Sequence, residues 1–192
     1  MTIETITVIG AGATARAITC SALLAGYRVV LEDVLPERLA SAVDEVRSCI
    51  ERATESGSVA ESASRVLARL GTASSVDLAC REAQLVIDTL PDEMEMKIDV
   101  FCILEKFARP GAILATNARS ISVTEIAAVT TRGERCIGLR FAPGAEGARP
   151  RLEIIRGAQT AGETAGACRE FARRITCEVI ELQEADGTAR PA

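Results

Sequence analysis

The feature that most constrains this chain is a short apolar strand that leads directly into a glycine turn and then a helix. Residues 5–9 alternate Thr with Ile and Val, and Gly10 and Gly12 follow at once. Residues 13–25 then have the apolar spacing of a helix. The glycines permit a tight turn, and the small side chain of Ala15 lets the helix lie close to the strand. This arrangement predicts a parallel α/β sheet whose first crossover begins here.

Apolar strand-like runs and longer helical stretches alternate along the rest of the chain. This alternation is typical of an α/β protein with a doubly wound, mostly parallel sheet of the Rossmann type. Two helical pieces, interrupted by Gly57, predict a helical hairpin over about residues 36–71, inserted after the second strand. We expect further strands at residues 28–31, 85–90, 112–116, 136–141, 152–155 and 178–182, and further helices at 92–107, from 122, and at 160–175.

Composition excludes several function classes. The chain of 192 residues carries a net charge of −5 and only 3% aromatic residues, so it lacks the basic surface that binds nucleic acid or anionic membranes, and the aromatic platforms that stack bases. It contains no His, which removes the commonest general base and most catalytic metal sites, and we expect no metal. The length predicts one domain over residues 1–184 and a flexible polar tail over 185–192.

The cysteines predict a reducing environment. They are odd in number, widely spaced and without a CxxC pair, and most lie in apolar runs, as small buried side chains do. The sequence also shows neither a signal-peptide pattern nor an apolar run long enough to span a bilayer. We therefore expect free thiols in a cytoplasmic protein. The seven positions are Cys20, Cys49, Cys80, Cys102, Cys136, Cys168 and Cys177.

The glycine turn carries a candidate dinucleotide site. A GxGxxA pattern lets a pyrophosphate approach the backbone at Gly12, and the first helical residues, Ala13 and Thr14, offer free N–H groups. Asp33 ends the second strand 23 residues after the first glycine, where an acidic residue accepts hydrogen bonds from the adenosine ribose. Glu32 beside it would repel a 2′-phosphate, so the pattern favours NAD over NADP. The alternative is a glycine turn in a domain that binds no nucleotide.

Five stretches of the chain follow one another in a characteristic order: ITVIGAGATARAI, GYRVVLEDVLPERL, LVIDTLPDEMEMKIDVF, GAILATNARSISVTEIA, and RGERCIGLRFAPG with RLEIIRG after it. In this order and spacing the chain resembles the NAD-binding domain of the 3-hydroxyacyl-CoA dehydrogenase family, over roughly residues 3–184. The resemblance implies that NAD is the cofactor and that the helical hairpin is a family feature. It further implies that Asp92, Lys97 and Asn117 stand at positions near the cofactor.

The chain departs from the family at the reacting centre. The resemblance implies a His as general base on the substrate hydroxyl, a Glu that orients it and a Ser that hydrogen-bonds the reacting oxygen. Here Arg140 stands at the His position and Arg119 at the Ser position, whereas Glu153 is retained. The turn that follows, residues 142–144, is altered as well. A guanidinium stays protonated at any usable pH and cannot accept the hydroxyl proton. We therefore expect a protein that binds NAD(H) without running the family's hydride transfer on its own.

The two arginines allow more than one interpretation. If both guanidiniums converge on the former substrate pocket, they would bind an anionic small molecule. Alternatively, Arg140 pairs with Glu153 and Arg119 extends into solvent. The resemblance implies a helical substrate domain for which we expect no counterpart in this chain. The second hypothesis is therefore an active oxidoreductase that a separate helical-domain chain completes, or that uses altered chemistry on a different substrate. The expected protein partners are a helical-domain chain or a second copy of this chain. A non-catalytic interaction module that binds no nucleotide is the third hypothesis.

Overall fold

Strands and helices alternate along most of the chain, as predicted. The computed structural model describes residues 2–142, 150–185 and 188–191. Its strands are β1 (Thr5–Ile9), β2 (Arg28–Glu32), β3 (Leu70–Ala73), β4 (Leu85–Asp88), β5 (Ile113–Thr116), β6 (Cys136–Ala142), β7 (Arg151–Arg156), β8 (Glu178–Ala185) and β9 (Thr188–Pro191). Its helices are α1 (Ala13–Leu24), α2 (Pro36–Glu55), α3 (Ala63–Leu67), α4 (Val76–Ala79), α5 (Met94–Phe107), α6 (Val123–Ala127) and α7 (Gly162–Arg174), with a short 3-10 turn at Gly133–Arg135.

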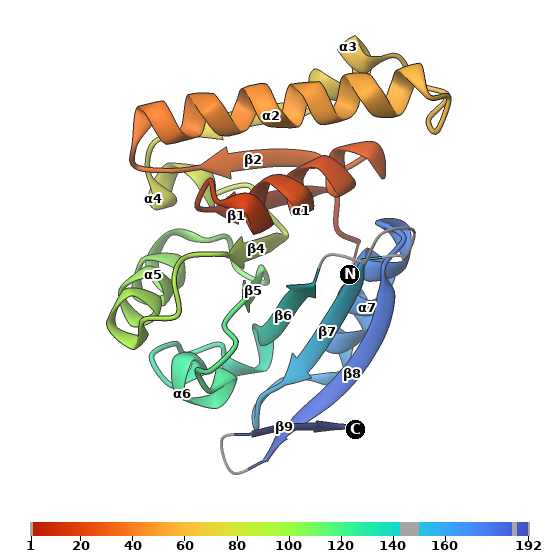
Figure 1. Cartoon of the computed structure of the whole chain (residues 1–192). Coiled ribbons are helices and arrows are strands. Elements are labelled where there is room, and N and C mark those ends of the chain that lie inside the picture. Colours follow the sequence, from red (N-terminus) through yellow and green to blue (C-terminus); the bar gives the residue numbers. More distant parts are fainter. Residues whose placement is uncertain (1, 143–149, 186–187, 192) are drawn as a thin grey trace.

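The strands form one sheet, in the order β3-β2-β1-β4-β5-β6-β7-β8-β9 (Figure 1). Six of its neighbouring pairs are parallel, and β6 with β7 and β8 with β9 are antiparallel. From β1 the chain winds outward through β2 and β3, then returns to β4 on the other side of β1. This reversal makes a doubly wound sheet, so the predicted fold class is confirmed. In such sheets ligands bind at the carboxyl ends of the strands beside the reversal.

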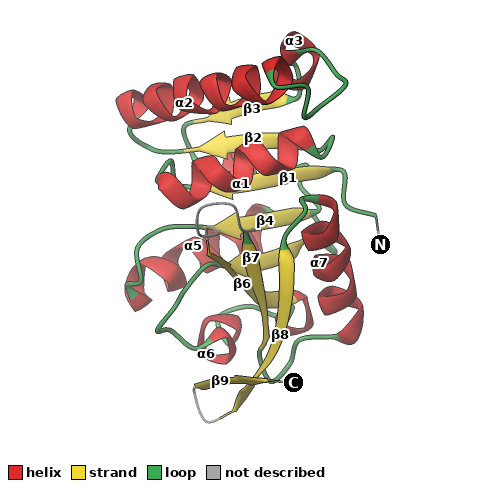
Figure 2. Ribbon diagram, turned by 45° about the vertical axis from the view of Figure 1, so that its right-hand side comes forward, coloured by secondary structure: helices red, strands yellow, loops and turns green. Residues whose placement is uncertain are grey.

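Helices cover both faces of the sheet and bury a separate apolar core on each (Figure 2). The first core includes Ile18 of α1, Val46 of α2 and Phe171 of α7. The second includes Phe101 of α5 and Ile126 of α6. Within the part of the chain that the structure describes, no helix is long and apolar enough to cross a membrane.

The segment after β2 contains the expected pair of helices but differs in its second half. The second helix, α3, spans only Ala63–Leu67, and the chain then enters β3, which the sequence analysis missed. Strand β3 pairs in parallel with β2, with Val29 opposite Leu70. Its four residues include Gly71 and lack a continuous apolar run, so they carry little strand signal by themselves. These residues become a strand because they pair with the free edge of β2.

Part of the segment that the sequence analysis assigned to a flexible tail has regular structure. Residues 188–191 form β9, which pairs antiparallel with β8, with Gln183 opposite Arg190. Strand β8 itself continues to Ala185, beyond the expected end at residue 182. The polar composition suggested fraying, but the backbone groups of β8 offer a long unpaired edge that a following segment can satisfy.

One cysteine pair contradicts the prediction of free thiols. Cys20 on α1 and Cys49 on α2 form a disulfide, with their Cα atoms 6.6 Å apart. They are 29 residues apart in the chain and meet because α1 and α2 pack side by side, which spacing alone does not reveal. The other five are free thiols, and Cys80, Cys136, Cys168 and Cys177 are buried as expected, whereas Cys102 is exposed.

Candidate functional site

The glycine turn lies at the carboxyl end of β1, next to the reversal of strand order. Gly10 has a φ of +90°, a conformation that side chains rarely adopt, and it starts the turn. A Cβ atom added at Gly12 would meet none of the described atoms within 4 Å, so a ligand can approach the backbone there. Helix α1 begins at Ala13, and the N–H groups of Ala13 and Thr14 have no acceptor within the helix. The turn therefore has the form of a pyrophosphate site.

Asp33 closes the other side of this turn. Its side chain is buried, and Oδ2 accepts a hydrogen bond from the backbone N–H of Ala11 at 3.0 Å, while Oδ1 accepts one from Leu35 at 2.9 Å. The Arg38 guanidinium lies 3.7 Å from Oδ2. Asp33 thus stands where the sequence placed the ribose acid and also fixes the glycine turn. A carboxylate has about four lone-pair sites, so capacity remains for ribose hydroxyls.

Glu32, the last residue of β2, is buried. Its side chain is 2% exposed, and Oε1 has no hydrogen-bond partner among the described residues. Burial, and secondarily the charge of Asp33, raise the pKa of Glu32 to about 7. Near neutral pH Glu32 is therefore only partly ionised, and Asp33 carries most of the expected repulsion of a 2′-phosphate.

Replacing Glu32 by Gln is expected to change how stability depends on pH. Because the pKa of Glu32 rises from 4.5 to about 7 on folding, its contribution is full at low pH and is lost as pH rises through 7. The variant should be more stable than the wild type by about 3 kcal/mol at pH 8, and nearly equal to it in stability at pH 4.5. Urea unfolding at both pH values measures this difference. Glu51→Gln, on the exposed face of α2, is the matched control and should show no such change.

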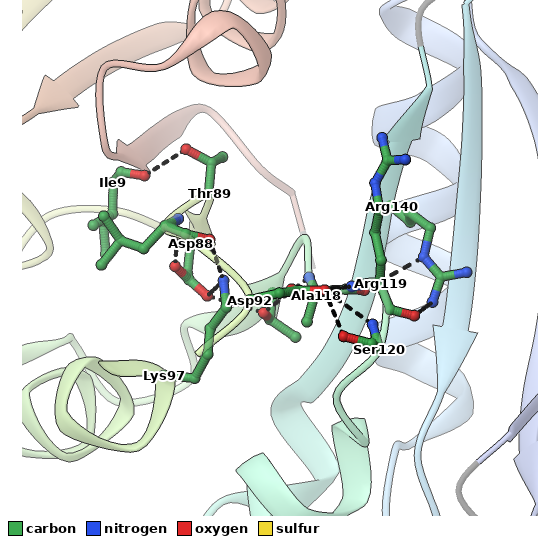
Figure 3. A network of polar contacts seen from close by, with 11 residues as sticks. Ile9, Asp88, Thr89, Asp92, Lys97, Ala118, Arg119, Ser120 and Arg140 are labelled. Carbon is green, nitrogen blue, oxygen red and sulfur yellow. Dashed lines mark hydrogen bonds and ion pairs between the residues drawn. The ribbon is translucent and has the colours of Figure 1, made fainter. Parts of the chain in front are cut away.

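Lys97 does not reach the surface of the site. Its side chain is 0% exposed, and Nζ donates to Asp88 Oδ2 and to the Leu90 carbonyl, both at 2.7 Å (Figure 3). Asp88 also accepts from the Thr116 hydroxyl at 2.9 Å. Two of the three N–H groups of this buried ammonium are thus engaged within the protein. A contact between Lys97 and the cofactor stays a prediction, and in the structure Lys97 joins α5 to the end of β4.

Asp92 and Asn117 brace the loop that follows β5. The Asp92 carboxylate accepts from the backbone N–H groups of Arg119 and Ser120, at 2.8 and 3.0 Å, and from the Ser120 hydroxyl. Burial acts to raise the pKa of Asp92, but these hydrogen bonds outweigh it and lower the pKa. Asn117 Oδ1 accepts from the Phe141 N–H at 2.7 Å and so ties this loop to β6. Both side chains hold the wall of the site in place.

Arg140 is held by three partners. Its guanidinium donates to the carbonyls of Ala118 and Arg119, at 3.3 and 2.8 Å (Figure 3). It also donates to Glu153 Oε2 at 3.1 Å. Glu153 also has the Arg151 guanidinium at 3.4 Å. The ion-pair interpretation of Arg140 is therefore confirmed.

Arg119 differs from Arg140. It is exposed, and its guanidinium has no partner among the described residues. The sequence analysis considered an anion bound by Arg119 and Arg140 together. Because the Arg140 guanidinium is already engaged, an anion there would contact mainly Arg119. Pro143 and Gly144 of the altered turn lie outside the described residues.

Two acidic residues of this region escaped the sequence analysis. Asp88 is the last residue of β4. Its carboxylate accepts hydrogen bonds from Lys97 Nζ, the Thr116 hydroxyl and the Leu90 N–H. An acidic residue at the end of an apolar strand is a sequence pattern that could have predicted this site residue. Glu184 on β8 accepts from the N–H groups of Val123 and Thr124 at 2.9 and 2.8 Å, and from the Thr124 hydroxyl. The 60 residues that separate Glu184 from Thr124 left no sequence signal for this contact.

Comparison with known proteins identifies the family. The model of the 3-hydroxyacyl-CoA dehydrogenase NAD-binding domain matches residues 5–185. The chain belongs to this family. It is 31% identical to a probable 3-hydroxybutyryl-CoA dehydrogenase of Bacillus subtilis, over 97% of this chain and 65% of the relative. It is 35% identical to the 3-hydroxybutyryl-CoA dehydrogenase of Bradyrhizobium diazoefficiens, over 95% of this chain and 62% of the relative.

The fold agrees with that of a solved family member. The crystal structure of 3-hydroxybutyryl-CoA dehydrogenase from Escherichia coli K12 superposes with a TM-score of 0.88 at 29% identity, and covers 97% of this chain and 39% of that one. NAD is the cofactor of the matched domain. This NAD-binding domain spans less than two thirds of the length of the two relatives above.

Proposed function

We propose that this domain binds NAD(H) at the glycine turn and does not perform the family's dehydrogenase chemistry by itself. The observation that carries the proposal is the Arg140–Glu153 ion pair, at the positions where the resemblance puts the family's His and Glu. Oxidation of a hydroxyl requires a base for its proton as the hydride leaves for NAD. Arg140 cannot be that base, and general base catalysis contributes about 10²–10⁴-fold.

Glu153 is a poor substitute for the missing base. Its two oxygens face two guanidiniums, from Arg140 at 3.1 Å and Arg151 at 3.4 Å. Both oxygens of Glu153 are therefore already engaged by ion pairs. Arg119, at the former Ser position, adds a third cation to this region. The local charge therefore suits an anion better than a proton transfer.

Calorimetric titration with NADH and NADPH, followed by an assay with acetoacetyl-CoA, tests the proposal. We expect micromolar binding of NADH, clearly weaker binding of NADPH because of Asp33, and no measurable NADH oxidation. Arg140→His with Arg119→Ser restores the family's residues and serves as the comparison. Turnover by the unaltered domain at the rate of a complete family enzyme would contradict the proposal. If neither nucleotide bound, a non-catalytic interaction module would be favoured.

The second candidate is an oxidoreductase subunit that another chain completes. The observation that favours it is the coverage, because the matched relatives extend well beyond the segment that this domain matches. A helical-domain partner or a second copy of this chain would then supply the remaining substrate contacts. In that case acetoacetyl-CoA turnover should appear only when the partner is added, or should rise with protein concentration if the partner is a second copy.

A further inference from the structure

The disulfide between Cys20 and Cys49 joins the two helices that follow the glycine turn and Asp33. Cys20 is about two turns into α1, the helix whose first turn borders the pyrophosphate site. Cys49 is near the end of α2, the helix that follows Asp33. The covalent ring closed by this bond therefore contains β2 and Asp33. It joins the helix that presents N–H groups to phosphate with the segment that carries the ribose acid.

A second contact between the same two helices reaches the turn directly. Arg16 of α1 pairs with Glu45 of α2 at 2.9 Å, and its guanidinium also donates to the Ala11 carbonyl at 3.1 Å. These side chains are 30% and 55% exposed, and exposed ion pairs contribute little stability. The ion pair can transmit a movement of α2 to the turn, but it is too weak to prevent one.

The two sulfur atoms differ in access. Cys20 is 6% exposed and packs in the first core, whereas Cys49 is only partly buried. A reductant would therefore attack the Cys49 sulfur and release Cys20 as the leaving thiolate. The thiols of Cys136, Cys168 and Cys177 are less reactive, because burial raises their pKa values to about 11, 12 and 11.

We propose that Cys20 and Cys49 form a reversible dithiol–disulfide pair whose state sets how tightly the glycine turn binds NAD(H). The proposal rests on the proposed binding of NAD(H) at that turn. In the reductive step a small dithiol forms a mixed disulfide with Cys49, and its second thiol then displaces Cys49. The dithiol gives two electrons and two protons to the protein and leaves as a disulfide. The S–S bond of the protein is replaced by two S–H groups.

Reduction should loosen the turn. Two thiols cannot approach as closely as two bonded sulfurs, and Cys20 has little room to move inside the core. We therefore expect α2 to shift outward, and Arg16, through its contacts with Glu45 and the Ala11 carbonyl, to pass part of the shift to the turn. The oxidised protein holds the turn preorganised, so we expect NADH to bind about fivefold more weakly after reduction, at the lower end of typical couplings between sites.

The test equilibrates the protein with reduced and oxidised dithiothreitol at several ratios, removes the reagent without air, and titrates each sample with NADH. A thiol count in denaturant should rise from the five free cysteines of the oxidised form to all seven. Cys49→Ser should bind NADH like the reduced wild type at every ratio. Cys102→Ser removes the exposed thiol of α5 and should keep the full response, which makes it the matched control.

Each other outcome overturns a stated part of the proposal. Seven thiols at every ratio would show that the pair does not oxidise. A thiol count that changes while NADH affinity stays constant would show that the bond is structural only. Absence of NADH binding in both states would remove the cofactor assignment on which the coupling rests, and the thiol count would still report separately whether the bond forms.

Discussion

Lys97→Met is expected to destabilise the domain by about 3–5 kcal/mol, the usual effect of removing one partner from a buried ion pair. The Asp88 carboxylate would keep its bonds from Thr116 and the Leu90 N–H but would lose its only counter-ion among the described residues, at 0% exposure. For a chain of 192 residues this corresponds to a fall in Tm of about 10 °C. Thermal and urea unfolding measure the loss.

Two comparisons isolate the ion pair as the cause. Lys106→Met removes an exposed lysine of the same helix, whose ammonium lies 5.0 Å from the Phe107 ring, and should cost less than about 1 kcal/mol. Adding Asp88→Asn to Lys97→Met removes the stranded charge and should recover about half of the loss. NADH affinity, measured well below the Tm, should change little, because Lys97 is not exposed to the cofactor. A large loss of affinity without a loss of stability would establish Lys97 as a cofactor contact.

Gly10→Ala is expected to weaken NADH binding at least about tenfold, a change of about 1.4 kcal/mol. At a φ of +90° an alanine is strained, and its Cβ would lie 3.1 Å from Thr89 Oγ1 and 3.3 Å from Leu90 Cδ2. Thr89 holds the end of β1 through a 2.7 Å bond to the Ile9 carbonyl. Relief of the contact therefore moves the turn that must meet the pyrophosphate. Calorimetric titration with NADH measures the effect.

Gly26→Ala separates backbone strain from the local contact. Gly26 has almost the same φ, +89°, but a Cβ there meets nothing within 4 Å. Both variants should lose about 1–2 kcal/mol of stability from the strained backbone. Only Gly10→Ala should lose NADH affinity. Equal affinities in the two variants would show that the glycine turn does not contact the nucleotide.

Local patterns in the sequence were sufficient for the fold and the cofactor turn. The apolar run of β1, Gly10, Gly12 and the start of α1 lie within about twenty residues, so turn chemistry and periodicity report on them directly. The position of Asp33 depends on the same β1–α1–β2 unit, because Asp33 comes directly after β2. The presence of Arg140 where the resemblance implies a His was equally visible, since it depends only on residue identity.

Contacts between distant segments decided the rest. The burial that raises the pKa of Glu32, and the burial of Lys97 against Asp88, depend on how strands and helices pack, and the same charged residues would be ordinary surface groups elsewhere. Strand β3 forms because β2 has a free edge, and the Cys20–Cys49 disulfide forms because two helices lie side by side. The sequence by itself thus determined the fold class and the glycine turn, and it placed Arg140 where the resemblance implies a His. Only the tertiary structure decided which of its charged and thiol groups are buried, paired or joined, because those properties arise from neighbours that the chain brings together only when it folds.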